Sequence, residues 1–458
     1  MTLWHGRFGS GPSDELMAYT VSLPFDRRLA GDDIEGSRAH VRGLVRGGLL
    51  DDTEASAIFV ALDTVSHELG QGMFEFVASD EDIHTAIERR VTELAGAAGA
   101  KLHTGRSRND QCATDLRLWC KRELRHVAQR LVALQQVLLR RAEEAGDSYL
   151  PGYTHMQRAQ PILLAHHLLA HGWALARDVD RLLATIERLD VSPLGAGALA
   201  GSSLPLDPHG TALDLGFARA FENSLDAVSD RDHVAEALFD LALIGVHLSR
   251  IGEEIVLWTT EEFGFARLDD AYATGSSMLP QKKNPDIAEL ARGKSGRLIG
   301  NLTGLMATLK GLPLAYNRDL QEDKEPLFDS TDQVLLALNA ITGMLDTIVF
   351  RHDRMEAAAD DPAAAAVDLA EYLVSHGTPF RQAHAIVGGL VRESLEGSTS
   401  LADLTAAHEL LGPDAARLLA PGAAVRNRTT AGSGGPAALV EQMRRFHERL
   451  AIDADRVT

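Results

Sequence analysis

The sequence predicts an all-α protein, on two observations. Its 458 residues are rich in Ala and Leu and only 5% aromatic, a composition that favours helices over strands. Residues 106–145 contain no Gly or Pro and carry apolar side chains at near-helical spacing, as at Leu131, Leu134 and Leu138. Helices of such length usually pack along one another. We therefore expect a bundle of long helices at the centre of the chain.

Composition also limits the functions open to the chain. A formal net charge of −20 argues against a nucleic-acid surface, because binding a phosphate backbone requires a basic face. The amino terminus has no basic region followed by an apolar core, and no apolar run reaches the roughly 20 residues of a membrane span, so we expect a cytoplasmic protein. The two cysteines, Cys112 and Cys120, are predicted to be reduced thiols in the core.

Residues 1–104 are predicted to form an N-terminal domain of short helices after an irregular start. Helical segments are expected around 33–40 and 81–88, the second after the candidate N-caps Ser79 and Asp80. Nothing in this part marks a site by itself. The hydroxyl and imidazole groups here fit an ordinary loop and an ordinary helix start.

The predicted central domain, residues 105–360, opens with a loop that leads into the long helix. Arg106, Arg108 and Asn109 lie at the mouth of this helix, where guanidinium groups and an amide are suited to holding a dicarboxylate. The alternative is a solvent-exposed first turn. Arg is a poor choice beside the positive end of a helix dipole, however, unless an anion binds there.

A second loop of this domain, residues 149–161, is stiffened by Gly and Pro and carries Thr154, His155 and Gln157. These polar groups lie on a turn rather than in a helix interior. A histidine on its own is more often structural than catalytic, so these residues become a candidate site only through the motif around them.

Three histidines follow this loop, at His166, His167 and His171. The last two lie one helical turn apart, which suggests a metal site. No Glu follows the first His as in the zinc-protease pattern, and no third ligand is evident nearby in the sequence. We therefore expect core or interface histidines and no metal.

The predicted function is organised around residues 274–286. Gly275 allows the backbone to move, Ser276 and Ser277 offer hydroxyl groups, and Lys282 supplies a cation that can hold a carboxylate. The stretch leads into a predicted helix start, whose free N–H groups and dipole also favour anions. In so acidic a chain, such a basic cluster indicates an anionic substrate. Taken alone, the same residues also fit a solvent-exposed loop.

The last polar stretch of the central domain is 314–325, which brings Tyr316, Gln321 and Lys324 together before another helix. As a bare run of charges it would pass for a solvated linker. An Ala-rich segment then begins a smaller helical domain, predicted to occupy residues 361–458.

Several of these motifs together resemble the fumarase/aspartase superfamily, whose enzymes eliminate fumarate from substituted succinates. The sequence Gly-Ser-Ser-x-x-Pro-Gln-Lys-Lys-Asn-Pro-Asp at 275–286 is typical of its argininosuccinate lyase/δ-crystallin branch, and further motifs lie at 101–111, 152–161 and 424–435. The resemblance therefore spans nearly the whole chain. Two departures are the apolar pair Met278-Leu279, in the reverse of the usual order, and His233, where an aromatic residue is expected; the first should have little effect, because both side chains are apolar and similar in volume.

The resemblance implies a three-domain fold with a central long-helix bundle, assembled as a homotetramer whose active sites draw on three subunits. It implies that the chain cleaves argininosuccinate to arginine and fumarate by base-catalysed β-elimination, without a metal or organic cofactor. In this scheme Ser276 is the base, activated by Lys282 and nearby N–H groups, while His155 with Thr154 protonates the leaving nitrogen. The side chains implied to bind the substrate are Ser22, His84, Ser107, Arg108, Asn109, Gln157, Ser277, Asn284, Tyr316, Arg318, Gln321 and Lys324.

Two other functions stay open at this point. One is a δ-crystallin-like structural protein that has kept the fold and lost the activity, which the retention of Ser276, His155 and Lys282 argues against. The other is a paralogue that acts on a different N-succinyl compound, and the unexpected His233 bears on this alternative.

Overall fold

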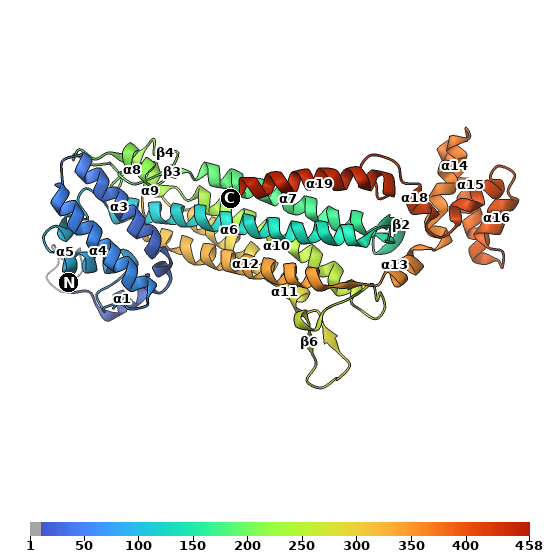
Figure 1. Cartoon of the computed structure of the whole chain (residues 1–458), viewed down its shortest axis with the longest axis horizontal. Coiled ribbons are helices and arrows are strands. Elements are labelled where there is room, and N and C mark those ends of the chain that lie inside the picture. The colour runs from blue at the N-terminus through green and yellow to red at the C-terminus, as the bar shows by residue number, and fades with distance from the viewer. Residues whose placement is uncertain (1–10) are drawn as a thin grey trace. The chain divides into compact units, whose positions relative to one another are not determined.

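The computed structural model describes residues 11–458, which are mostly helical (Figure 1). Two compact units interleave along the chain. Unit 1 comprises Met1–Val127, Arg181–Ala242 and Gly296–Gln333, and unit 2 comprises Ala128–Asp180, Leu243–Ser295 and Val334–Thr458. The expected helical class is confirmed, although short strands accompany the helices. The division into domains at 1–104, 105–360 and 361–458 stays a prediction.

Five long helices run through the chain, in line with the expectation that long helices form its centre. They are α6 (Arg108–Ala145), α7 (Leu164–Arg188), α10 (Asp232–Trp258), α11 (Asp286–Leu309) and α12 (Lys324–Thr347). The helix predicted over 106–145 is confirmed by α6, whose 38 residues contain no helix breaker. None of the described helices is long and apolar enough to cross a membrane.

Shorter elements complete unit 1. They are α1 (Asp14–Thr20), α2 (Leu23–Asp26), α3 (Ala30–Arg46), α4 (Asp52–Gly70), α5 (Ile83–Ala95), α8 (Pro208–Asp214), α9 (Ser224–Ser229), the parallel strands β3 (Val191–Ser192) and β4 (Arg219–Ala220), and the 3₁₀ turns η2 (Arg27–Leu29), η3 (Gly99–Lys101) and η5 (Arg318–Asp323). The expected N-caps Ser79 and Asp80 were wrong. The Asp82 carboxylate, nearer the helix, accepts the Thr85 N–H and starts α5.

The core of unit 1 joins the first half of α6 to the start of α12. The Trp119 and Phe328 rings pack with centroids 4.5 Å apart, and the Arg28 guanidinium lies over both rings. In the same unit, the guanidinium of Arg231 and the ammonium of Lys324 both donate to the buried carboxylate of Asp323. This packing fixes the start of α12, from which Lys324 projects.

Unit 2 contains the remaining elements. They are β1 (Tyr149–Thr154), β2 (Gln157–Leu163), β5 (Ala266–Arg267), η4 (Asp270–Tyr272), β6 (Thr274–Gly275), β7 (Lys283–Asn284), β8 (Val349–Phe350), α13 (His352–Ala359), η6 (Pro362–Ala365), α14 (Ala366–Ser375), α15 (Phe380–Glu396), α16 (Leu401–Ala407), α17 (Gly412–Ala416), η7 (Arg417–Leu419), α18 (Ala423–Arg426) and α19 (Pro436–Arg456). The small helices α14 to α17 share an apolar core that includes Leu369, Val387 and Leu401.

Two antiparallel hairpins of unit 2 carry predicted catalytic residues. Strands β1 and β2 pair from Tyr149 opposite Leu163 to Thr154 opposite Gln157, and β6 pairs with β7. Both segments were expected to be loops. Their Pro and Gly residues concealed the strands, because such residues are depleted in strands in general.

Candidate active site

Unit 1 contains a cavity of about 350 Å³ that brings together side chains from four separate stretches of the sequence. Its lining residues are Ser22, Asp26, Glu81, Asp82, His103, Arg108, Asn109, Cys112, Tyr316, Arg318, Gln321 and Lys324. Seven of them were predicted to bind substrate: Ser22, Arg108, Asn109, Tyr316, Arg318, Gln321 and Lys324. The cavity therefore collects most of the predicted binding residues in one place.

One wall of the cavity is held by Asp26. The Ser22 hydroxyl donates to one oxygen of this carboxylate at 2.5 Å, while its other oxygen accepts the N–H of Ile83 at 3.0 Å. Burial raises the pKa of Asp26 above its usual value, although His84 and Ser22 oppose this rise. Asp26 thus ties the segment that carries Ser22 to the beginning of α5.

The start of α6 forms the second wall. The Asp110 carboxylate accepts N–H groups from Ser107, Gly195 and Gly197 at 2.9 to 3.0 Å, which ties the loop around 195–197 to this helix. The Asn109 amide then donates to the Ala198 carbonyl at 3.0 Å. The hydroxyl of Ser107 accepts the Asn109 N–H and does not line the cavity.

Arg108 turns into the cavity but already has a carboxylate partner. Its Nε lies 3.1 Å from an oxygen of Asp82, and its Nη2 donates to the Thr85 hydroxyl at 3.1 Å. Burial would raise the pKa of Asp82, but Arg108 and His84 outweigh it and hold that pKa below its usual value. The cavity wall therefore presents both signs of charge.

The third wall comes from η5 and the first residue of α12. The ammonium of Lys324 is 2.8 Å from Asp323, and burial of the lysine is outweighed by this carboxylate, so the pKa of Lys324 rises. Burial also raises the pKa of the Tyr316 hydroxyl. Arg318 donates to the Thr20 carbonyl at 2.7 Å. These contacts fix the cations before any ligand binds.

His84 lies behind the cavity rather than in its wall. The imidazole is 1% exposed, with Nδ1 lying 3.0 Å from Asp33 and 3.2 Å from Asp115, and Nε2 lying 3.1 Å from the sulfur of Cys112. Burial and the neighbouring Asp33 raise the pKa of Asp115 to about 8. Direct contact between His84 and substrate stays a prediction, since Cys112 lies between this ring and the cavity.

The hairpin of β1 and β2 carries Thr154, His155 and Gln157 at its tip, all exposed. His155 and Met156 form its two-residue turn with φ of 54° and 58°. Non-glycine side chains are strained in this left-handed region, and such strain tends to persist at functional sites. The His155 side chain is exposed at this turn.

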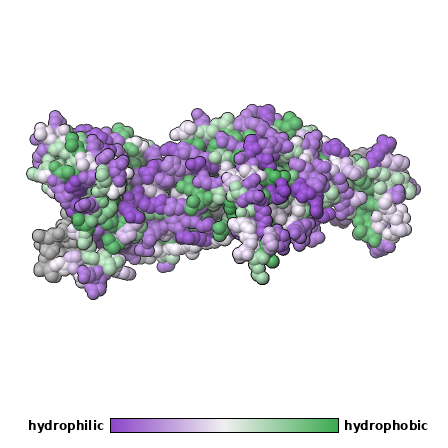
Figure 2. Space-filling view, turned by 60° about the horizontal axis from the view of Figure 1, so that its bottom comes forward, coloured by the Kyte–Doolittle hydropathy of each residue, from purple (hydrophilic) through white to green (hydrophobic). Residues whose placement is uncertain are grey.

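The loop between β6 and β7 carries the other predicted catalytic residues and projects from the helices of unit 2 (Figure 1). The hydroxyl oxygen of Ser276 accepts the N–H groups of Met278 at 3.2 Å and Leu279 at 3.0 Å. Figure 2 shows hydrophobic residues on the projecting loop, in agreement with exposures of 86% for Met278 and 45% for Leu279. Ser277 and Lys282 are also exposed.

The base of this loop is anchored. Lys283 donates to the Leu268 carbonyl and to Asp270, both at 2.6 Å, and the Asn284 amide lies 3.4 Å from the Thr274 hydroxyl. Ser276 is predicted to be activated by nearby N–H groups, and those of Met278 and Leu279 already donate to its oxygen. Within unit 2, the tip of the β1–β2 hairpin and the β6–β7 loop lie apart in Figure 1.

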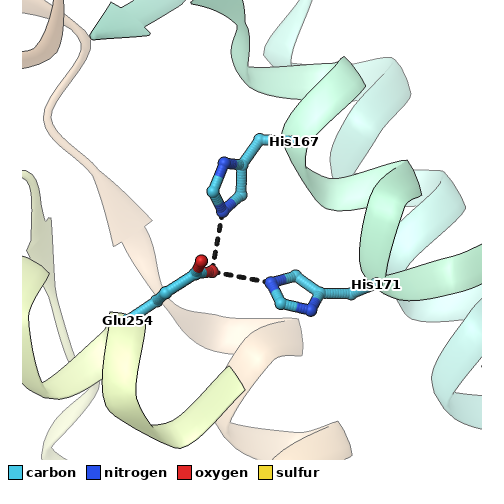
Figure 3. Close-up of side chains that lie close together, drawn as sticks. All are labelled: His167, His171 and Glu254. Carbon is cyan, nitrogen blue, oxygen red and sulfur yellow. Dashed lines mark hydrogen bonds and ion pairs between the residues drawn. The ribbon is translucent and has the colours of Figure 1, made fainter. Parts of the chain in front are cut away.

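His167 and His171 meet Glu254 of α10 (Figure 3). Their Nε2 atoms lie 2.7 and 2.6 Å from one carboxylate oxygen. Two imidazoles and a carboxylate are a donor set that zinc accepts. Among residues 11–458, Asp33, His84 and Asp115 form another cluster of possible donors, with one imidazole and two carboxylates, all buried. In the cluster drawn in Figure 3, the Glu254 carboxylate can accept a hydrogen bond from a ring N–H of each histidine, His167 and His171. The expectation of no metal stays a prediction.

Comparison with known proteins agrees with this geometry. Residues 6–300 match the lyase family model, and residues 363–426 match the model of the argininosuccinate lyase C-terminal region. An argininosuccinate lyase from Frankia casuarinae is 55% identical, covering 99% of this chain and 99% of that protein. One from Roseiflexus castenholzii is 49% identical, covering 98% and 99%.

Solved structures share the fold. An EDDS lyase in complex with formate superposes with a TM-score of 0.84 at 27% identity, covering 98% of this chain and 92% of that one. A class II fumarase from Schistosoma mansoni has the same fold, with a TM-score of 0.74 at 15% identity over 91% and 94% of the two chains. These matches define the class of protein: a mostly helical lyase of the fumarase/aspartase type. Within this class, the chain belongs to the argininosuccinate lyase family.

Sequence reasoning missed part of the cavity. Cys112 was expected to be a core thiol, and this was wrong: only Cys120 is fully buried, while Cys112 lines the cavity. Both cysteines are free, as predicted. Asp26, Asp110 and Asp323 were not singled out either. Their sequence gives no signal for partners that lie far along the chain, and only the fold reveals them.

Proposed function

We propose that the chain is an argininosuccinate lyase that splits argininosuccinate into arginine and fumarate by β-elimination. The cavity supports this best, because it combines Arg108, Arg318 and Lys324 with the carboxylates of Asp26 and Asp82. Argininosuccinate carries carboxylates as well as cationic nitrogen groups, so it needs partners of both signs. Relatives that bear this name cover nearly the whole chain.

In the proposed reaction, the oxygen of Ser276 removes the proton from the succinyl carbon next to a carboxylate. That C–H bond breaks, negative charge moves onto the carboxylate, and a C=C bond then forms as the C–N bond breaks. The electron pair of the C–N bond leaves with the guanidino nitrogen. The N–H groups of Met278 and Leu279 would lower the free energy of a negatively charged Ser276 oxygen, since both already point at it.

The leaving nitrogen needs a proton, which we assign to His155 with Thr154. Both side chains are exposed at a strained turn, free to meet a substrate. Lys282, Ser277 and Asn284 would hold the succinyl carboxylates from the loop, joined by Ser107, Arg108 and Asn109. Tyr316, Gln321 and Lys324 would hold polar groups of both the succinate and the arginine side. The rest of the predicted set is Ser22, His84, Gln157 and Arg318. No step of this scheme calls for a metal or organic cofactor.

We also propose that the protein assembles as a homotetramer with sites shared between subunits. One face of α11 supports an association, because Ile299 and Met306 are 47% and 53% exposed. On the same helix no atom lies within 4 Å of the Cβ position that a side chain would have at Gly296, Gly300 or Gly304. An exposed apolar face with small residues suits close packing against a helix of another copy.

The activity is tested by following fumarate absorbance after adding argininosuccinate to the purified protein. Adenylosuccinate, aspartate and EDDS are run in parallel, the last because an EDDS lyase shares the fold. Fumarate from argininosuccinate alone supports the proposal. Fumarate only from another N-succinyl compound identifies the chain as a paralogue, and a folded tetramer without any activity identifies a δ-crystallin-like structural role.

Shared sites are tested by mixing two inactive variants, Arg108→Gln in the cavity and Ser276→Ala in the loop, after dissociating and reassembling them. If each site takes its cavity and its loop from different chains, up to about a quarter of the sites become intact. A mixture of Ser276→Ala with Lys282→Met, both in one loop, is the matched control and should stay inactive. Activity in neither mixture would show that each site comes from a single chain.

A further inference from the structure

We propose that Cys112 is a reactive thiol in the substrate cavity, and that fumarate, the product of the proposed function, alkylates it. The inference rests on that function for the origin of fumarate but on the geometry of the cavity for the reactivity. Its outcome would be a protein that is slowly inactivated when its own product accumulates.

The geometry around Cys112 is that of an activated thiol. Its sulfur lines the cavity and lies 3.1 Å from Nε2 of His84. The opposite ring nitrogen, Nδ1, lies 3.0 Å from Asp33 and 3.2 Å from Asp115, which orient the imidazole. A thiol, an imidazole and a carboxylate in this order form the arrangement that generates a thiolate in cysteine-dependent catalysts.

Cationic side chains also lie near the sulfur. Cys112 lies in the second turn of α6 and shares the cavity with the cations Arg108 and Lys324. Burial would lower the pKa of His84, but Cys112, Asp115 and Asp33 outweigh it and raise this pKa well above its usual value. A protonated imidazole therefore lies beside the sulfur, where it can donate a proton.

Cys120 provides the contrast within the same helix. Its side chain is 0% exposed, and burial raises the pKa of its thiol to about 12. A thiol in this state neither ionises near neutral pH nor meets a dissolved electrophile. The chain thus contains one thiol built to react and one built not to, and no others.

Fumarate suits Cys112 in both charge and chemistry. Its alkene is activated by two carboxyl groups, and Arg108 and Lys324 can hold these carboxylates within the cavity. The thiolate sulfur forms a bond to one alkene carbon, the π electrons move to the other carbon, and that carbon takes a proton from the imidazolium of His84. The net result is addition of the S–H group across the C=C bond, with no oxidant or leaving group. The succinyl group then fills the cavity.

The test is incubation of the full-length protein with fumarate, followed by mass spectrometry of the digested chain. We expect one added fumaric acid on Cys112, none on Cys120, and a loss of lyase activity that follows the adduct in time. Succinate has the same charges without the double bond, so it should leave no adduct and should slow the reaction with fumarate. Cys112→Ser should keep its own starting activity through the incubation. An adduct spread equally over both thiols, or none at all, would overturn the proposal.

Two further measurements separate this inference from the proposed function. Ser276→Ala keeps the cavity but cannot turn over substrate, so fumarate should still alkylate its Cys112. Iodoacetate tests the thiol without fumarate: Cys112 should react at least about tenfold faster than Cys120, and faster with anionic iodoacetate than with neutral iodoacetamide. A His84→Asn variant should lose this advantage. If iodoacetate reacts with Cys112 no faster than with Cys120, the thiol is not activated, whatever the enzyme's substrate.

Discussion

The cavity of unit 1 and the loop between β6 and β7 in unit 2 are built in opposite ways, although both were predicted to serve one reaction. The cavity cation Lys324 is buried and held by the Asp323 carboxylate, so it is in position without a ligand. In the loop, the oxygen of Ser276 contacts only the backbone of its own turn, and Lys282 is exposed. The difference is that the cavity side chains are held in place by their partners, whereas the side chains of the loop are held only at its base; a loop of this kind can close over a ligand.

The largest expected effect, and the strongest test of this contrast, is on the rate of the reaction. Ser276→Ala should lower kcat by about 10³-fold, since the loss of a general base typically costs 10²- to 10⁴-fold. Its thermal midpoint should not change, because the hydroxyl bonds only to N–H groups that water can reach in the open loop. Steady-state kinetics and a thermal scan on one sample give both quantities.

The neighbouring serine is the matched control for this experiment. Ser277→Ala removes an exposed hydroxyl from the same loop and should mainly raise KM, as expected for a residue that binds rather than reacts. If the two variants lost kcat equally, Ser276 would not be the base and the loop would act only as a binding element.

The sequence predicted the helices well and the buried side of the cavity poorly. The absence of Gly and Pro is a local signal, and it placed α6 within two residues of its observed start. Cys112 and Cys120 were assigned the same buried environment because they share that helix. Eight residues at 3.6 per turn rotate a side chain by about 80°, enough to turn it from the core to the cavity. The direction in which a side chain points depends on the residues that pack around it, and a local sequence pattern does not contain that information.

The residues of the candidate site also differ in how far the sequence could predict them. The motifs singled out Arg108, Tyr316 and Lys324, each from a stretch with several polar residues, and the structure brings these three side chains to one cavity; their role in binding substrate stays a prediction. Their supports were not predicted: Asp323 pairs with Arg231, far away in the sequence, and a lone Asp in a polar run gives no hint of its partner. The third group beside His167 and His171 was missed for the same reason.

A second prediction concerns the stability of the folded protein at acidic pH. His233 is buried, with Nδ1 lying 3.6 Å from a carboxylate oxygen of Asp230, and burial, reinforced by the nearby Arg117, lowers its pKa to about 4. Between the unfolded value of about 6.5 and pH 4, the unfolded chain takes up a proton that the folded chain refuses, so acid favours unfolding by up to about 3 kcal/mol. His233→Phe removes this loss, and its thermal midpoint should fall less from pH 7 to pH 4.5.

The exposed histidine of unit 2 is the control for the buried one. His155→Asn should follow the wild-type midpoint throughout this pH range, because the ring meets water in the folded and unfolded chain alike. Parallel loss of stability in wild type and His233→Phe would mean that burial of His233 does not resist protonation.

The smallest effect concerns the strained turn. Met156→Gly should raise the thermal midpoint, because glycine adopts the φ of 58° without the cost of about 1 kcal/mol that a side chain incurs. Gly at this position keeps His155 and the β1–β2 pairing in place. A lower midpoint would show that the Met156 side chain makes contacts worth more than the strain, and the hairpin would then resemble the preformed cavity.

The exposed loop also bears on how long each molecule survives. Lys282 and Met278 lie on a projecting segment anchored at both ends, the kind of backbone that proteases cut first. A cut there would remove the proposed base and leave the helices intact. Closure over a substrate would hide the same peptide bonds. With such closure, enzyme that is turning over substrate would be cut more slowly than idle enzyme, and the amount of protein would follow the supply of its substrate.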